Sequence, residues 1–304
     1  MNHSTKFSMS YHDSPAIWKS LLLQGVKEDG WPWDWTSLGI QPKSASVKAR
    51  IIAKSDGIWA AEGLVAALSL VAPELGTASR ARELLTASSR VRTGTRFKKT
   101  QTVCEWKGIP ELVLALERPF LNLAAYACGV ATATRRIVEL VRKACPERTP
   151  RITATRKTLP GYRDIAIHSV IAGGGYSHRV NLAGGVLVKE NHIASAGSVS
   201  KAVTAARRIA PHGLKIEVEV RSERELSEAL RAQADVVMLD NFSPKEVRNA
   251  VALVERSSHR PLIEVSGGLN ENTIAAYAMP GVDILSLGGL THSVRAADLS
   301  LLVT

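Results

Sequence analysis

Acidic side chains stand at the ends of two short apolar runs in the second half of the chain. Glu219 lies in the run IEVEV, and Asp240 ends the run VVMLD. A buried carboxylate needs a cation or a hydroxyl group as its partner, and Mg²⁺ or a ribose would serve. We therefore predict that Glu219 and Asp240 bind Mg²⁺ or a sugar. The alternative for each carboxylate is a buried structural ion pair.

Glycine pairs follow the last two apolar runs of the chain. Gly267 and Gly268 come directly after Ser266, and Gly288 and Gly289 end the run DILSLGG. In β/α barrels the loops after the final strands commonly bind phosphate through backbone N–H groups, and glycine lets the phosphate approach closely. The two pairs together predict a phosphate site.

Basic side chains gather at or near the same run ends. The set consists of Arg156, Lys157, His178, Arg179 and Lys189. His178 and Arg179 follow a glycine-rich loop, AGGGYS, that begins at Ala172. Arginine binds carboxylates in bidentate geometry, so this set predicts a site for a small molecule with several negative charges. A purely structural role is the alternative for His178.

The runs that carry these residues have the composition of strands in a parallel sheet. They begin at Arg151, Gly185, Lys215, Asp235, Pro261 and Asp283. Most are continuously apolar, as expected for strands buried on both faces. Enzymes built on β/α barrels place their chemistry at the carboxyl ends of such strands. We therefore expect the acidic, basic and glycine residues to converge at one end of a barrel.

Helices with recognisable starts separate these strands. Capping boxes begin at Ser222 and Ser243, and Asn270 is expected to cap a helix that carries Ile274. Units of roughly 20 to 30 residues repeat in this way, which favours a β/α barrel over a sandwich. An open doubly wound sheet is the alternative. Before Pro150 strands and helices do not alternate strictly, which predicts a separate α+β region.

Composition bounds the class of protein. The chain has 304 residues, 45% of them hydrophobic, and no apolar run reaches the roughly 18 residues of a membrane span. Residues 1–10 lack an apolar segment, so they predict a disordered tail and no secretory signal. The three cysteines form no CxxC pair, which favours a reducing, cytoplasmic location and plain structural roles.

The chain is basic, with 39 Lys and Arg against 28 Asp and Glu. Its one dense basic run, RVRTGTRFKK from Arg90, comes without any motif typical of nucleic-acid binding. We therefore expect neither a nucleic acid nor a membrane as partner. A non-catalytic barrel that binds polyanions is the alternative from a different functional class.

Several stretches resemble the quinolinate phosphoribosyltransferases, a type II phosphoribosyltransferase family also called carboxylating nicotinate-nucleotide diphosphorylases. The resemblance covers most of residues 115–300, in family order, and extends more weakly into the N-terminal half at EDGWPWDWTS and around Lys54 to Gly63. The matching stretches are ERPFLN at Glu117, CGVAT at Cys128, TRKTLPGYR at Thr155, AGGGYSHR at Ala172, VLVKENHI at Val186, IEVEV at Ile216, MLDNFSP at Met238, EVSGGL at Glu264 and GVDILSLGGLTHS at Gly281.

The resemblance implies roles for the site residues. The acceptor acid, quinolinate, would be bound by Arg156, Lys157, His178 and Arg179, with Arg118 supplied by the neighbouring subunit of a head-to-tail homodimer, or of a higher oligomer. Phosphoribosyl pyrophosphate would be bound by Lys157, Lys189, Ser266, Gly267, Gly268, Gly288, Gly289 and His292. Glu219 and Asp240 would hold Mg²⁺, directly or indirectly, and would be catalytic together with Lys189.

The resemblance also implies a fold and a reaction. An N-terminal α+β sandwich domain over residues 1–120 would precede an incomplete, roughly seven-stranded β/α barrel over residues 121–292, and the tail 293–304 would pack back on the first domain. The enzyme, a pentosyltransferase, would make nicotinate mononucleotide, CO₂ and pyrophosphate for NAD biosynthesis.

Three positions depart from the usual family pattern. Ala154 stands where the family usually has Asp, Asn181 where Gly is usual, and Gly289 where Ala is usual. The phosphoribosyl machinery is intact, whereas the acceptor side is altered. A paralogue that phosphoribosylates another pyridine or aromatic carboxylic acid in a secondary pathway is therefore the alternative within the family.

Overall fold

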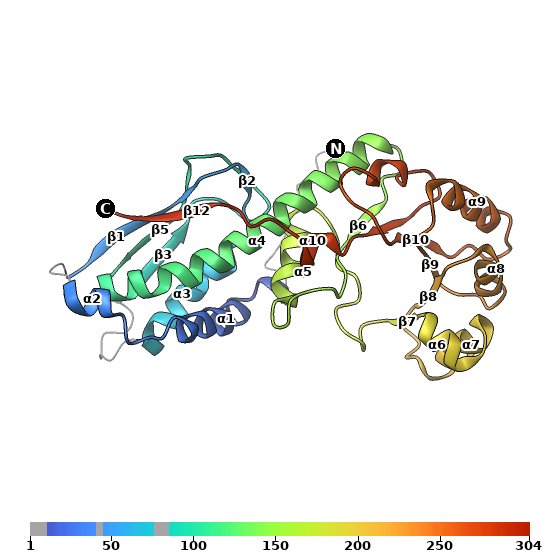
Figure 1. The fold of residues 1–304 in the computed structure, drawn as a ribbon, viewed down its shortest axis with the longest axis horizontal. Coiled ribbons are helices and arrows are strands. Elements are labelled where there is room, and N and C mark those ends of the chain that lie inside the picture. The colour runs from blue at the N-terminus through green and yellow to red at the C-terminus, as the bar shows by residue number, and fades with distance from the viewer. Residues whose placement is uncertain (1–10, 41–44, 76–84) are drawn as a thin grey trace. The chain divides into compact units, whose positions relative to one another are not determined.

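The computed structural model describes residues 11–40, 45–75 and 85–304 (Figure 1). The tail at residues 1–10, predicted from the sequence to be disordered, lies outside the described residues. The chain divides into two compact units. Unit 1 contains residues 1–135, 159–174 and 294–304, and unit 2 contains residues 136–158 and 175–293. The boundary near residue 120 that the resemblance implies stays a prediction.

Unit 1 is built on an antiparallel sheet in the order β12-β1-β5-β3. Alternate residues of β1 are buried, namely Ala49, Ile51 and Ala53, because successive side chains of a strand point to opposite faces. The sheet thus has one apolar face. The strands are β1 (Val47–Ala53), β3 (Leu85–Ser89), β5 (Thr102–Gly108) and β12 (Leu299–Val303), and a separate pair joins β2 (Gly57–Ile58) to β4 (Arg96–Phe97).

Helices supply the other half of the unit 1 core. Trp18 and Leu22 of α1 and Leu64 and Leu68 of α3 belong to the same buried cluster as the apolar face of the sheet. The C-terminal strand β12 pairs with β1 from Ala49 to Ala53, so the end of the chain completes the sheet formed by its N-terminal part. The helices of unit 1 are η1 (Tyr11–Asp13), α1 (Pro15–Glu28), α2 (Trp35–Ile40), α3 (Glu62–Leu75), most of α4 (Pro110–Ala144) and α5 (Arg163–Ala172).

Unit 2 contains a parallel sheet whose strands are connected by helices. Six strands form it in the order β6-β11-β10-β9-β8-β7, and all of unit 2 lies within the described residues. The strands are β6 (Arg151–Thr153), β7 (Val186–Val188), β8 (Ile216–Val220), β9 (Val236–Asp240), β10 (Leu262–Ser266) and β11 (Ile284–Ser286). The helices are α6 (Glu190–Ala196), α7 (Val199–Ile209), α8 (Glu223–Arg231), α9 (Pro244–Glu255), η2 (Ile274–Ala276) and α10 (Gly289–His292).

The strand order confirms an incomplete β/α barrel. The first strand, β6, pairs with the last, β11, while no pairing joins β6 to β7. Besides the six strands, one parallel bridge joins Thr153 to Tyr176. Tyr176 also binds Ile152 and Ala154 through backbone hydrogen bonds. This segment is too short for a strand, so the barrel has six strands and one bridge.

The predicted helix starts are right in two places and wrong in one. Ser222 accepts from the Glu225 N–H at 3.2 Å, and Ser243 and Glu246 form a complete capping box. The Asn270 side chain instead accepts from the Asn272 N–H, so it closes a turn. Only the short 3₁₀ helix η2 follows it.

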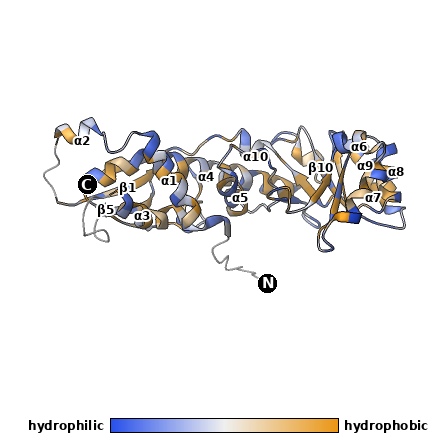
Figure 2. Cartoon of the chain, turned by 90° about the horizontal axis from the view of Figure 1, so that it is seen from below, coloured by the Kyte–Doolittle hydropathy of each residue, from blue (hydrophilic) through white to orange (hydrophobic). Residues whose placement is uncertain are grey.

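Side-chain polarity differs between the sheet of unit 2 and the helix α8 that covers it. Figure 2 shows the sheet around β10 as largely hydrophobic and α8 as largely hydrophilic, and the buried residues of α8 are Leu226, Ala229 and Leu230. In the described part of the chain, no helix has both the length and the apolarity needed to span a membrane.

Candidate active site

A cavity of about 570 Å³ opens at the carboxyl ends of the unit 2 strands. Its size suits a small-molecule ligand. All of the site residues predicted on the barrel line it, namely Arg156, Lys157, His178, Arg179, Lys189, Glu219, Asp240, Ser266, Gly267, Gly268, Gly288, Gly289 and His292. Arg118, the remaining predicted residue, lies on α4 in unit 1 and is exposed.

Strand register explains why these side chains converge. In the parallel sheet Ser266 of β10 lies beside Asp240 of β9 and Ser286 of β11. Glu219 of β8 lies beside Met238 of β9, which comes two residues before Asp240. Glu219 therefore lies deeper in the barrel than Asp240. Because parallel strands end at one edge of the sheet, each strand delivers its last inward-facing side chain to the same cavity.

The buried carboxylate of Glu219 is paired with Lys189. The Lys189 Nζ lies 2.8 Å from Glu219 Oε2, and Lys189 is 46% exposed whereas Glu219 is 8% exposed. The β7 strand ends at Val188, so Lys189 starts the loop into α6, where its backbone N–H donates to His192 Nδ1 at 2.9 Å. The ammonium therefore compensates a carboxylate that would otherwise be buried alone.

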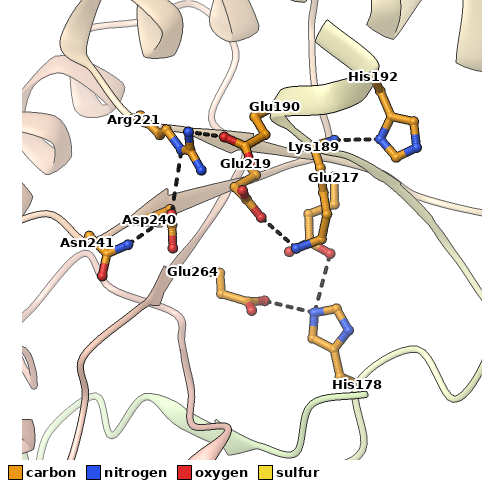
Figure 3. A network of polar contacts seen from close by, with 10 residues as sticks. All are labelled: His178, Lys189, Glu190, His192, Glu217, Glu219, Arg221, Asp240, Asn241 and Glu264. Carbon is orange, nitrogen blue, oxygen red and sulfur yellow. Dashed lines mark hydrogen bonds and ion pairs between the residues drawn. The ribbon is translucent and has the colours of Figure 1, made fainter. Parts of the chain in front are cut away.

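The carboxylate of Asp240 is held from two sides. Arg221 approaches it at 3.7 Å and also contacts Glu190, while Asn241 Nδ2 donates to Asp240 Oδ2 at 3.0 Å (Figure 3). Asn241 adopts a left-handed backbone with φ 60°. Its neighbour Gly267 has φ 90°, and a Cβ there would lie 2.3 Å from Asn241 Oδ1. Only glycine allows this close approach between the β9 and β10 loops.

Two further carboxylates, Glu217 and Glu264, lie deeper in the barrel and were not predicted as site residues. Both are buried, and each places its Oε2 3.3 Å from Nε2 of His178 (Figure 3). Burial raises the pKa of the Glu217 carboxyl. Burial alone would lower the pKa of His178, but its hydrogen bonds with Glu217 and Glu264 outweigh that effect and raise it to about 10. His178 is therefore an imidazolium at neutral pH.

The spacing of the glutamates could have revealed Glu217. Residues two apart in a strand share a face, so IEVEV places Glu217 on the same side as Glu219. The side chains of His178, Glu217 and Glu264 bring atoms that could bind a metal ion within 4.8 Å of one another, and they form the one such cluster among the described residues. The imidazolium of His178 already supplies positive charge to this cluster.

The basic side chains on the other side of the cavity have no carboxylate partner within the described residues. The Arg156 Nε is buried without a hydrogen-bond acceptor. Arg179 donates from Nη1 to the Gly185 carbonyl at 3.3 Å, and its pKa is lowered by burial and then by repulsion from Arg156. Two guanidinium groups thus face a cavity in which their preferred partner, a carboxylate, would have to come from a ligand.

Glycine residues shape the rest of the wall. A Cβ at Gly288 would lie 3.0 Å from both Lys157 Cδ and His292 Nε2, so the absent side chain leaves room for these two side chains. At Gly289 a Cβ would meet nothing within 4 Å. The departure at Gly289 therefore makes no steric difference.

Of the other two departures, Asn181 has a local explanation, whereas nothing in the structure explains Ala154. Ala154 is buried, and its N–H donates to the Tyr176 carbonyl. The Asn181 Oδ1 accepts from the N–H groups of Ala183 and Gly184, at 3.0 and 2.9 Å, and so closes the turn before β7. An Asn side chain stabilises this turn where glycine would rely on backbone freedom alone.

Fold and site together define a β/α-barrel protein with a cavity at the carboxyl ends of its strands that basic side chains, carboxylates and glycine loops line. The model of the quinolinate phosphoribosyl transferase C-terminal domain matches residues 130–302, and that of the N-terminal domain matches residues 34–128. The chain therefore belongs to the quinolinate phosphoribosyltransferase family.

Known proteins agree with this assignment. Two relatives are named probable nicotinate-nucleotide pyrophosphorylase (carboxylating). That of Methanocaldococcus jannaschii is 42% identical over 66% of this chain and 71% of its own length, and that of Bacillus subtilis is 36% identical over 94% and 93%. The solved nicotinate-nucleotide pyrophosphorylase of Francisella tularensis is 30% identical with a TM-score of 0.85, covering 98% of this chain and 100% of its own.

Proposed function

We propose that this chain transfers the phosphoribosyl group of phosphoribosyl pyrophosphate to quinolinate, with loss of one carboxylate. The products are nicotinate mononucleotide, pyrophosphate and CO₂, and the reaction belongs to NAD biosynthesis. The observation that carries the proposal is the lining of one cavity, which combines arginines that have no ion pair with a carboxylate among the described residues with the carboxylates Glu219 and Asp240 and two glycine loops. The names of the family's curated members support it.

We call the first group, Arg156, Lys157, His178 and Arg179, the acceptor side. Quinolinate carries two carboxylates, and guanidinium groups bind carboxylates in bidentate pairs. Because neither Arg156 nor Arg179 forms an ion pair with a carboxylate among the described residues, both are available to the carboxylates of the acid. They hold the ring nitrogen toward the ribose, which it attacks.

We call the second group, Lys189, Glu219, Asp240 and the two glycine loops, the donor side. The 5′-phosphate lies against Ser266 and the two glycine pairs, Gly267–Gly268 and Gly288–Gly289, where the absence of side chains lets a phosphate approach the backbone N–H groups of the glycines. The pyrophosphate is bound by Lys157, Lys189 and His292. As pyrophosphate leaves, positive charge develops on the ribose, and the carboxylates of Glu219 and Asp240 stabilise it.

Mg²⁺ fits the donor side by its chemistry. Glu219 and Asp240 offer hard oxygen ligands at the mouth of the cavity, and proteins usually bind Mg²⁺ through one or two carboxylates together with substrate phosphates. Bound there, Mg²⁺ would neutralise charge on the departing pyrophosphate. Lys189 and Arg221 hold these carboxylates before substrate arrives.

Once the ring nitrogen has attacked, the acceptor becomes a pyridinium. The positively charged ring stabilises the electron pair that stays on the ring carbon when the adjacent carboxylate leaves as CO₂, and this carbon then takes up a proton from water, so the step needs no protein nucleophile. The cysteines agree with that conclusion, because burial raises the pKa of both Cys104 and Cys128 to about 12.

A homodimer, or a higher oligomer built from it, completes the proposal. Arg118 is exposed on unit 1, and we assign it to the acceptor of the neighbouring subunit. The cytoplasm is the expected compartment, which the three free cysteines support. A merely polyanion-binding role gains no support from the family.

The test is to incubate the chain with phosphoribosyl pyrophosphate, Mg²⁺ and a panel of pyridine and aromatic carboxylic acids. We expect release of pyrophosphate and CO₂ in equal amounts with quinolinate, and none after a chelator removes Mg²⁺. Release with another acid but not with quinolinate would establish the paralogue. No release with any acid would refute the proposal.

A further inference from the structure

Beneath the cavity, two buried carboxylates share one histidine nitrogen. Glu217 is 7% exposed and Glu264 is 1% exposed, and their Oε2 atoms both lie 3.3 Å from Nε2 of His178. The strands β8 and β10 that carry them are separated in the sheet by β9 alone. Both glutamates therefore point into the barrel, and they reach the ring from two sides (Figure 3).

The arrangement fixes where the hydrogens are on the ring. An imidazole nitrogen without hydrogen would point its lone pair at two carboxylate oxygens, which is repulsive. With hydrogen on Nε2, the ring donates to Glu264 Oε2 and forms an ion pair with Glu217 Oε2. The negative charge around it raises the pKa of His178 to about 10, so the other nitrogen, Nδ1, carries hydrogen as well at neutral pH.

Nδ1 is then a donor that no described residue uses. His178 lines the cavity, and its two hydrogen-bond partners within the described chain both contact Nε2. The remaining oxygens of the two glutamates, Glu217 Oε1 and Glu264 Oε1, are buried without partners. Among the described residues, His178 is the one cationic side chain that contacts both carboxylates, and it does so through Nε2.

We propose that Glu217 and Glu264 are positioning residues that hold His178 as a cation and leave its Nδ1–H to donate to a carboxylate of the acceptor. This inference rests on the proposed function and extends it to two residues that do not touch the substrate themselves. A neutral histidine has only one N–H, and here the glutamates would use it. The contact between Nδ1–H and a carboxylate of the acceptor acid therefore requires the charged ring.

The test uses Glu217→Gln and Glu264→Gln. Glutamine keeps an oxygen that accepts from Nε2–H, so the ring stays in place while the negative charge is removed. Asp164→Asn is the matched control, because Asp164 pairs with His12 at 2.9 Å in unit 1, outside the cavity. Circular dichroism and the melting temperature establish that each variant is folded.

Two readouts are needed. Nitrogen NMR of ¹⁵N-labelled histidine, with His178 assigned from a His178→Gln variant, should show a doubly protonated ring in the unaltered chain at pH 7.5. In each glutamine variant His178 should titrate at lower pH. The KM for quinolinate should rise about tenfold, the loss of one charge-assisted hydrogen bond, while the KM for phosphoribosyl pyrophosphate changes little. The control should change neither.

The outcomes separate this inference from the proposed function. If quinolinate is turned over but both variants keep its KM, or if His178 is neutral in the unaltered chain, the positioning role is wrong and the function stands. Equal rises in both KM values would indicate a general structural role and would also overturn it. If quinolinate is not turned over while the NMR behaves as expected, the function fails and the buried triad stands. Should a glutamine variant not fold, the spectrum of the unaltered chain still decides the charge of His178.

Discussion

The acceptor and donor sides of the cavity balance charge in different ways. On the donor side each carboxylate already has a cation: Lys189 lies 2.8 Å from Glu219, and Arg221 lies 3.7 Å from Asp240. On the acceptor side Arg156 keeps a buried Nε without an acceptor, and Arg179 contacts only a backbone carbonyl within the described residues.

This difference matches the ligands that the two sides are proposed to bind. A paired carboxylate costs less to bury than an unpaired one, and its cation can turn toward a phosphate that arrives with Mg²⁺. An unpaired guanidinium is poised for a ligand carboxylate but costs stability until that ligand binds. The donor side is thus arranged for exchange of partners during reaction, and the acceptor side for recognition. Changes on the donor side should lower kcat, and changes on the acceptor side should raise the KM of the acid.

The largest effect should come from Lys189→Ala. It removes a pyrophosphate contact and leaves Glu219 as an uncompensated carboxylate, so kcat should fall by about a thousandfold. Steady-state release of pyrophosphate measures it. Lys201→Ala on the exposed side of α7 is the control and should keep the original rate. A kcat near that of the unaltered chain would remove Lys189 from the donor side.

Arg156→Lys tests the acceptor side more selectively. Lysine keeps the charge but cannot form a bidentate pair with a carboxylate, so the KM for quinolinate should rise about a hundredfold with a smaller change in kcat. Arg224→Lys, at a side chain that is 89% exposed on α8, is the control. If the KM for phosphoribosyl pyrophosphate rose instead, the assignment of the two sides would have to be reversed.

Gly267→Ala tests how the donor side is built. The added Cβ would meet Asn241 at 2.3 Å, and the φ of 90° is strained for alanine. We expect a loss of about 2 kcal/mol in the free energy of unfolding, together with a higher KM for phosphoribosyl pyrophosphate. Gly213→Ala is the control, since a Cβ there meets nothing within 4 Å. Urea denaturation compares the two, and equal stabilities would contradict the close packing of these loops.

The smallest effect concerns pH. The pKa of His178 is raised from 6.5 to about 10 in the folded chain, so its contribution to stability is fully present below pH 6.5 and is lost as the pH rises through 10. The KM for quinolinate should therefore stay constant between about pH 7 and 9 and increase near pH 10. A rise centred near pH 6.5 would show that His178 is not held as a cation.

The sequence alone determined the positions of the strand-end residues. Continuous apolar runs placed the six strands, and every predicted site residue on the barrel lines the cavity, because a parallel sheet brings its strand ends to one edge. The glycine pair at Gly267 and Gly268 could also be identified from the sequence, because a positive φ is a local property of the backbone that favours glycine.

Only the tertiary structure decided which charges meet. Glu217 and Glu264 lie 47 positions apart by residue number, and they share His178 only because the sheet curves until β8 and β10 face a common interior. The helix expected after Asn270 shrank to a short 3₁₀ turn. Strand composition is set locally, whereas the pairing of buried charges depends on the closure of the barrel and on contacts between residues distant in the chain.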